Sequence, residues 1–222
     1  MNVNKHAAYF DPNTVTDPIH VIGVGAIGST FCELLARLGI PAINIYDFDT
    51  VEEHNVANQL YTSSQIGTLK TTALKNMLLE INPLLECTCF DKGYRAGMSL
   101  SGIVILAVDS IDLRKEIVTA QMYNPNVKLI MDFRMRLEDA QHYAADWSNE
   151  KQRKNLLATM QFTEEEAREA TPVNACGSTL AIAPTIRTVT SAGAANLINF
   201  WLGKPIKNTV LVNPFAFSTA AF

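Results

Sequence analysis

A glycine-rich stretch near the N-terminus constrains the fold more than any other part of this chain. Gly23, Gly25 and Gly28 directly follow the apolar run 19–22, and Asp47 stands 19 residues beyond the last of these glycines. In such a stretch the first glycine permits a tight turn, the second lets the backbone approach phosphate, and the third lets a helix pack closely on a strand. A carboxylate after the next strand is positioned to bind ribose hydroxyls. The sequence therefore predicts a nucleotide-binding α/β unit.

Strand-like and helix-like segments alternate over the first two thirds of the chain. The expected strands are 19–23, 43–47, 86–90, 102–108, 128–133 and 140–146, and the expected helices are 27–38, 68–80 and 111–123. Gly39 and the pair Asn82-Pro83 are the expected stops of the first two helices. This alternation predicts an α/β fold with a doubly wound, mostly parallel (Rossmann-like) sheet and helices on both faces.

The last third of the chain has a different composition. Residues 148–175 are rich in Glu, Lys, Arg, Gln and Asn, which predicts a solvated helix and a mobile charged loop. Residues 178–202 are small and mostly apolar, which predicts a long helix that ends at Gly203. We therefore expect a single domain over 1–222 with a long C-terminal helix.

Composition argues against several classes of function. The net charge is −4 and no basic cluster is present, so general nucleic-acid binding is not expected. The N-terminus lacks an apolar signal core, and Pro184 and Arg187 interrupt the most apolar stretch, so neither secretion nor membrane spanning is expected. The four cysteines are Cys32, Cys87, Cys89 and Cys176. They form no C-x-x-C pair, which argues against a zinc site or a disulfide framework and favours the cytoplasm.

Polar residues gather just after the second and the fourth expected strand, where a doubly wound sheet binds its ligands. They are Asp47, Asp49, Asn55, Asn58, Gln59 and Lys70 after the second strand, and Asp109 after the fourth, with Arg114 five residues further on. An NAD site needs only the ribose acid here. An ATP site also uses a lysine that neutralises the polyphosphate and a second carboxylate that holds Mg²⁺. Lys70 and Asp109 therefore favour ATP over NAD or FAD.

Taken together, these motifs resemble the ThiF/MoeB/HesA family, the adenylating core of ubiquitin-activating enzymes. The matching pieces are Gly23-x-Gly25-x-x-Gly28, Asp47-x-Asp49-x-Val51, Asn55 and Gln59, Gly67-x-x-Lys70, Asn82-Pro83, and Asp109 with Arg114. They follow the family's order, and the resemblance covers roughly residues 9–202. It implies an adenylyltransferase that uses ATP and Mg²⁺ to activate a carboxylate, typically the C-terminus of a ubiquitin-like or sulfur-carrier protein. It also implies a homodimer.

The resemblance assigns a role to each matching residue. Asp47 would hold the ribose hydroxyls, and Asn55, Gln59 and Lys70 would contact the phosphates of ATP. Asp109 would coordinate Mg²⁺. Attack of the carboxylate on the α-phosphate would give an acyl-adenylate and pyrophosphate.

One departure from the family's pattern lies in the phosphate-binding segment. Where the family usually has Asn-Leu-Asn-Arg-Gln, residues 55–59 are Asn-Val-Ala-Asn-Gln, so Asn58 replaces a phosphate-binding arginine. Asparagine keeps a donor but loses the full charge and the bidentate geometry. Either another cation, Arg134 or Arg136, compensates for the loss, or catalysis is weaker or absent. The family also commonly supplies an arginine to the site from the N-terminal segment of the partner. The first arginine of this sequence is Arg37, so the N-terminal segment offers no match for that residue.

Cys176 is a candidate nucleophile. It stands at the expected start of the last helix, where unpaired N–H groups and the helix dipole favour thiolate. The alternative is a small buried residue under the charged loop. His20, within the first strand, is expected to be a hydrogen-bonded core residue.

Three alternatives for the function stay open. The chain could be a non-catalytic partner subunit of an adenylating enzyme, or an NAD- or FAD-dependent oxidoreductase. It could also adenylate a peptide, a modified nucleoside on tRNA or a small acid.

Overall fold

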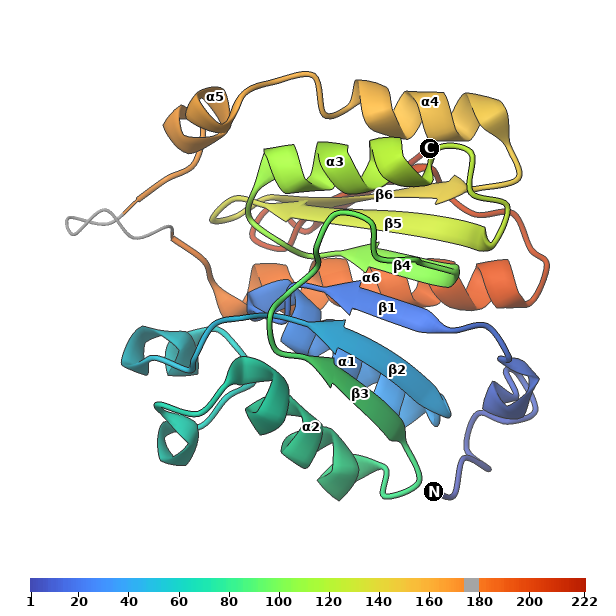
Figure 1. Ribbon diagram of the computed structural model, residues 1–222, viewed down its shortest axis with the longest axis vertical. Helices are drawn as coiled ribbons and strands as arrows, with labels where there is room; N and C mark the ends of the chain where they lie inside the picture. Colours follow the sequence, from blue (N-terminus) through green and yellow to red (C-terminus); the bar gives the residue numbers. More distant parts are fainter. Residues whose placement is uncertain (174–179) are drawn as a thin grey trace.

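One eight-stranded sheet runs through the protein, whose computed structural model describes residues 1–173 and 180–222 (Figure 1). The strands are β1 (Ile19–Ile22), β2 (Ala42–Tyr46), β3 (Glu86–Phe90), β4 (Gly102–Leu106), β5 (Val127–Met135), β6 (Ala140–Asp146), β7 (Thr209–Asn213) and β8 (Ser218–Ala221). The α-helices are α1 (Ala26–Leu38), α2 (Lys70–Ile81), α3 (Ile111–Gln121), α4 (Glu150–Ala158), α5 (Glu164–Glu169) and α6 (Ala183–Trp201). The short 3-10 helices are η1 (Pro12–Thr14), η2 (Glu53–Ala57) and η3 (Ser63–Gln65).

The strand order is β3-β2-β1-β4-β5-β6-β7-β8. Strands β1 to β5 pair in parallel, whereas β6, β7 and β8 are antiparallel to their neighbours. The chain moves outward from β1 through β2 to β3 and then returns to place β4 on the other side of β1. This reversal confirms the predicted doubly wound, mostly parallel sheet, and it creates a switch point between β1 and β4.

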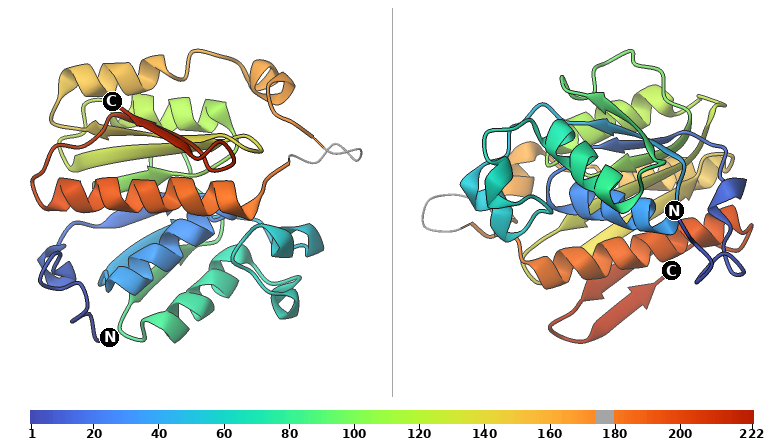
Figure 2. Two further views of the ribbon diagram at one scale, coloured as in Figure 1. Left: turned by 180° about the vertical axis from the view of Figure 1, so that it is seen from behind. Right: turned by 90° about the horizontal axis from the view of Figure 1, so that it is seen from below.

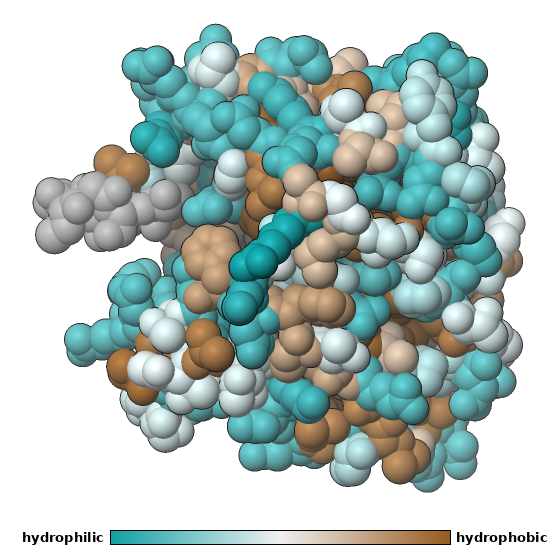
Figure 3. All heavy atoms as spheres, in the orientation of Figure 1, coloured by the Kyte–Doolittle hydropathy of each residue, from teal (hydrophilic) through white to brown (hydrophobic). Residues whose placement is uncertain are grey.

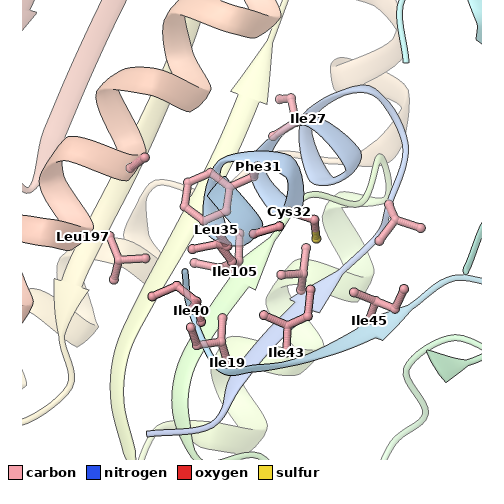
Figure 4. Packing of buried hydrophobic residues seen from close by; sticks show 14 of the residues in the cluster. Ile19, Ile27, Phe31, Cys32, Leu35, Ile40, Ile43, Ile45, Ile105 and Leu197 are labelled. Atoms are coloured by element: carbon pink, nitrogen blue, oxygen red, sulfur yellow. The ribbon is translucent and has the colours of Figure 1, made fainter. Parts of the chain in front are cut away.

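Helices cover both faces of the sheet. Figure 2 shows α1, α2 and α6 together on one face, and α3 and α4 lie on the other. Alternate residues of the central strands serve the two layers: Ile105 packs in the cluster that contains Phe31 of α1, and Leu106 packs in the cluster that contains Ile117 of α3. Figure 4 shows the first of these clusters, in which α1 lies on β1 and β2. Strands buried on both faces explain the continuous apolar runs in the sequence.

Helix α1 is bounded by glycines at both ends. Gly25 is its N-cap, and Gly39 follows its last residue in the left-handed conformation, with φ +83°. The Gly39 N–H donates to the carbonyl of Ala36, which closes the helix as predicted. Asn82 ends α2, also as predicted.

The C-terminal helix begins later than expected. Residues 180–182 are not helical, and α6 starts at Ala183, so the predicted start at 178 is wrong for the described residues. Pro184 is in the first turn, where its missing N–H has no helical acceptor to lose. Within 148–175 the structure forms α4 and α5. Beyond α6, the antiparallel pair β7 and β8 was not predicted.

On the face drawn in Figure 3, the apolar side chains lie in small groups between polar ones and form no single large hydrophobic patch. Within the described residues, no helix combines the length and the hydropathy needed to cross a bilayer.

Candidate functional site

The glycine loop lies at the switch point of the sheet. Gly23 has φ +87°, and a Cβ on it would lie 2.8 Å from the carbonyl of Ala107, just beyond β4. A Cβ on Gly28 would lie only 1.9 Å from the Gly23 oxygen. Both glycines are therefore needed for the close approach of β1, α1 and β4. Gly25 is different, since a Cβ there would meet no atom within 4 Å in the described structure.

Gly25 opens the start of α1 to a ligand. As the N-cap it carries no side chain that could accept from the first-turn N–H groups, and the first turn holds no acidic residue. These N–H groups and the positive end of the helix dipole are therefore left for an anion such as phosphate.

The carboxylate of Asp47 is held against the glycine loop by two backbone donors. Its Oδ2 accepts from the Val24 N–H at 2.8 Å, and its Oδ1 accepts from the Asp49 N–H at 2.9 Å. Burial raises the pKa of Asp47 above its usual value, and the two N–H donors oppose that shift. Each oxygen keeps a second lone-pair site, so the carboxylate can also accept from a pair of ligand hydroxyls.

Lys70 is buried at the start of α2 and aimed toward the end of β2. Its Nζ lies 2.8 Å from Oδ2 of Asp49, and its backbone N–H donates to the Asp49 carbonyl. The lysine side chain is 9% exposed, whereas that of Asp49 is 50% exposed. Because an ammonium group has three donors, two remain for a polyphosphate that reaches this point.

The predicted phosphate-binding amides lie on helix η2 and directly after it. Asn55 is buried, and its Oδ1 accepts from the Glu52 N–H at 2.9 Å, so only its NH₂ group is left for phosphate. The side-chain oxygens of Asn58 and Gln59 are buried without a partner among the described residues. The structure thus brings these amides to the segment between β2 and α2 but leaves two of them unsatisfied.

Tyr61 fastens this segment to the glycine loop, a role that the sequence did not reveal. Its hydroxyl donates to the Val24 carbonyl at 2.7 Å, and the neighbouring Leu60 N–H donates to the Ser29 hydroxyl at 3.2 Å. The signal available in the sequence was a tyrosine that closely follows the mostly polar residues 52–59.

Asp109 lies exposed just beyond β4, and its carboxylate has no hydrogen-bond partner in the part of the chain that the structure describes. Arg114, by contrast, is buried and does not face solvent. It donates to the carbonyls of Val108 and Phe133 and pairs with Asp132, a fully buried carboxylate on β5. Asp132 was missed in the sequence, although an acid inside an apolar strand is the pattern that would have marked it.

The two arginines that were considered as replacements for the missing charge at Asn58 differ in placement. Arg134 lies 2.6 Å from Oδ2 of Asp132 and donates to the Thr159 carbonyl at 2.8 Å, so its charge is already paired. Arg136 is exposed just after β5. Of the two roles that the sequence left open for Arg134, phosphate contact and salt bridge, the structure therefore favours the salt bridge.

The donor set fits a metal that arrives with phosphate. Among the described residues, no group of three or more His, Cys, Asp or Glu side chains could hold a metal ion. Mg²⁺ in nucleotide sites is typically held by one or two carboxylates together with phosphate oxygens and water. A single exposed carboxylate such as Asp109 meets that requirement.

The remaining candidates lie apart from this site or outside the description. Cys176 lies outside the described residues, and the helix whose start was expected there begins at Ala183. Cys32 is fully buried in α1, and burial raises the pKa of its thiol. His54 is exposed beside Glu52. His20 is a buried, hydrogen-bonded residue, as expected, since Nδ1 bonds the Tyr46 hydroxyl at 2.8 Å. Its buried Nε2, however, has no partner in the described structure.

Two open hollows, of about 460 and 550 Å³, lie around Tyr123 and Asn124 at the C-terminal end of α3. This is the end of α3 opposite to Asp109. None of the predicted site residues lines either hollow. The candidate site at the switch point therefore lies apart from both hollows.

Comparison with known proteins gives one family. A family model described as the ThiF family matches residues 16–220. Over 65 residues the chain is 40% identical to the ubiquitin-like modifier-activating enzyme 5 of Arabidopsis thaliana, and 37% identical to that of Caenorhabditis elegans. These matches cover 29% of this chain but only 15% and 16% of those proteins.

Solved structures give the same fold over nearly the whole chain. The crystal structure of PaaA matches with a TM-score of 0.69 and 15% identity, over 96% of this chain and 65% of that one. The structure of Escherichia coli MccB with ATP matches with a TM-score of 0.68 and 17% identity, over 95% of this chain and 64% of that one. The chain thus spans somewhat less than two thirds of these structures.

Proposed function

The chain belongs to the ThiF family, and from that premise we propose that it binds ATP with Mg²⁺ and adenylates a carboxylate. The observation that carries the proposal is a continuous set of contacts around the open backbone at Gly25. Asp47 bonds the Val24 N–H, Lys70 pairs with Asp49, and Gly23 lies against the strand end that presents Asp109. These contacts support a site at the switch point in which the start of α1, Asp47, Lys70 and Asp109 would act together on one nucleotide.

The same residues divide the work of adenylation. Asp47 would accept from the ribose hydroxyls, the first turn of α1 and Lys70 would neutralise phosphate charge, and Asp109 would hold Mg²⁺. When bound, Mg²⁺ supplies charge neutralisation for the leaving pyrophosphate. Nucleophilic attack by the carboxylate on the α-phosphate then asks the protein mainly for positioning and electrostatics. No covalent role for a protein side chain is required.

The substrate that we propose is the C-terminus of a ubiquitin-like or sulfur-carrier protein. Support comes from the relatives named ubiquitin-like modifier-activating enzyme 5. A peptide is a competing substrate that the sequence leaves open. The proposal includes a homodimer, which the family resemblance implies, and a cytoplasmic location, which the cysteine spacing of the sequence favours.

Calorimetry and pyrophosphate exchange test this function. ATP binding should weaken when EDTA removes Mg²⁺, and NAD should bind more weakly than ATP. Asp109→Ala should lower carboxylate-dependent ATP–pyrophosphate exchange by about 100-fold or more, as removal of a single electrostatic contact does in other enzymes. Asp112→Ala is the matched control, because Asp112 is an exposed acid only three residues away and lies 3.9 Å from Lys115. Tighter binding of NAD, or equal losses in the two variants, would contradict the proposal.

A second candidate function is a non-catalytic subunit that keeps the fold and assists a competent homologue. The observation that favours it is the lack of a free positive charge to replace the family's arginine. Asn58 stands at that position, and Arg134 is already paired with Asp132. This hypothesis predicts that the protein alone binds ATP but shows no ATP–pyrophosphate exchange, and that exchange occurs when a catalytic homologue is added.

A further inference from the structure

Side chains from elsewhere in the chain hold both neighbours of Asp109. On one side, the carbonyl of Val108 accepts from Nη2 of Arg114. On the other side, the hydroxyl of Ser110 donates to Oε1 of Glu164 at 2.6 Å. Arg114 belongs to α3, but Glu164 comes from α5, more than fifty residues further along the chain. The exposed carboxylate therefore lies between a backbone carbonyl and a serine side chain that are both held by hydrogen bonds.

Glu164 bonds the start of α3 at more than one point. Its Oε1 also accepts from the Asp112 N–H at 3.2 Å, while the Ser110 hydroxyl accepts from the Leu113 N–H at 3.1 Å. A carboxylate at the start of an 11-residue helix is stabilised by the helix dipole and by the unpaired N–H groups. The hydrogen bond from Ser110 lowers the pKa of Glu164 below its usual value. The ionised carboxylate of Glu164 therefore stabilises the N-terminal end of α3.

Helix α5 depends on this contact more than on burial. None of its six residues is buried, and its own stability comes from a capping box between Thr163 and Glu166. Figure 1 shows α5 at the side of the molecule where the parallel strands end. Glu164 is therefore placed to couple the position of α5 to the geometry of the strand end at Asp109.

We propose that Glu164 is a positioning residue for Asp109: by holding Ser110 and the first turn of α3, it fixes the direction in which the Asp109 carboxylate meets Mg²⁺. This inference rests on the proposed function. Asp109 makes no hydrogen bond of its own within the described residues, so its aim depends on the backbone that carries it. Loss of the Glu164 contact should weaken the response to Mg²⁺ and leave metal-free nucleotide binding intact.

The test compares Glu164→Ala with Glu165→Ala. Glu165 is the next residue of α5, is exposed, and its side chain makes no hydrogen bond or ion pair among the described residues, so both variants lose one charge from one helix turn. The readout is the Mg²⁺ concentration that half-saturates ATP binding in calorimetry, with ATP binding in EDTA and the melting temperature measured alongside. We expect Glu164→Ala to raise the half-saturating Mg²⁺ about fivefold, the size of effect expected from one lost hydrogen bond. Glu165→Ala should leave it unchanged.

Two further variants separate positioning from charge. Ser110→Ala removes the same hydrogen bond without changing any charge, so it should give a similar shift, and combining it with Glu164→Ala should add little. Glu164→Gln keeps an acceptor but loses the charge, and its shift should be the smaller one. A shift in Glu164→Gln as large as in Glu164→Ala, with none in Ser110→Ala, would assign the effect to charge and overturn the positioning role.

The outcomes also separate this inference from the function on which it rests. If the unmodified protein binds ATP without any response to Mg²⁺, both the proposed function and the positioning role are refuted. If it responds to Mg²⁺ and Glu164→Ala responds identically, only the positioning role is refuted. A fall in melting temperature alone, with the Mg²⁺ response unchanged, would reduce Glu164 to a structural contact.

Discussion

Substitution of two glycines of the same loop should separate folding from ligand binding. In Gly28→Ala the new Cβ would lie 1.9 Å from the Gly23 oxygen, so α1 and β1 must move apart by about 1 Å to restore contact distance. The obstacle is backbone and cannot rotate away. Overpacking of this kind costs about 1–3 kcal/mol or more, against a helix-propensity gain of about 1 kcal/mol for alanine.

We therefore expect Gly28→Ala to lose about 1–2 kcal/mol of unfolding free energy. For a chain of this size that corresponds to a melting temperature lower by about 2–8 °C. Gly25→Ala should behave differently, because its Cβ would meet no described atom within 4 Å. The cost at an N-cap is below about 1 kcal/mol, but the methyl group would stand where phosphate approaches the helix start. ATP affinity should fall by about tenfold or more, equivalent to at least about 1.4 kcal/mol.

The assays are thermal unfolding by circular dichroism and ATP calorimetry on both variants below the lower melting temperature. Gly28→Ala should move the first quantity and Gly25→Ala the second. Unchanged ATP affinity in Gly25→Ala would mean that phosphate does not bind at this helix start. Unchanged stability in Gly28→Ala would refute the packing argument.

Two further predictions concern charge. Asn58→Arg should raise pyrophosphate exchange if the missing guanidinium limits the reaction; an unchanged rate in a protein that still binds ATP would favour the partner-subunit reading. Burial lowers the pKa of both His20 and His142, a fully buried residue of β6, from 6.5 to about 4. The unfolded chain therefore binds more protons than the folded chain between these pH values. Stability should therefore fall as the pH drops from about 6.5 toward 4, by about 2 kcal/mol per histidine between pH 7 and pH 5. In urea unfolding at these two pH values, His142→Gln should show a smaller loss than the unmodified protein, and an equal loss would contradict this assignment.

The sequence predicted the parts of the fold that depend on local pattern. The glycine loop, the cap at Gly39 and the stop at Asn82 are each determined by a few consecutive residues, and all lie where expected. The hairpin β7–β8 was not predicted, because β8 is exposed along its whole length and shows no apolar alternation. The start of α6 was placed too early, because apolar composition does not reveal where extended backbone gives way to helix.

The candidate site divides in a similar way. Asp47 and Asp109 were predicted because they come just after strands, and Lys70 because it opens the helix that follows the second strand. In the structure all three lie at the edge of the sheet where the parallel strands end. The pairing of Asp132 with two arginines could not be predicted, since it joins α3 and β5, and Arg134 alone was ambiguous between ligand and salt bridge. The contact between Glu164 and Ser110 joins residues that lie even further apart in the sequence, so it could not be predicted either. Sequence reasoning finds residues that a motif needs, and it misses residues that hold the motif in place.

The contact of Gly23 with the end of β4 has a consequence for the order of folding. β1 can pair with β2 through a short connection, but its pairing with β4 joins Ile19 to Ile103 and must wait for closure of a much longer loop. The glycine loop is thus complete only after that closure. A nucleotide that binds there recognises no partly folded chain that lacks β4, so its full binding energy stabilises the finished sheet against partial opening between β1 and β4.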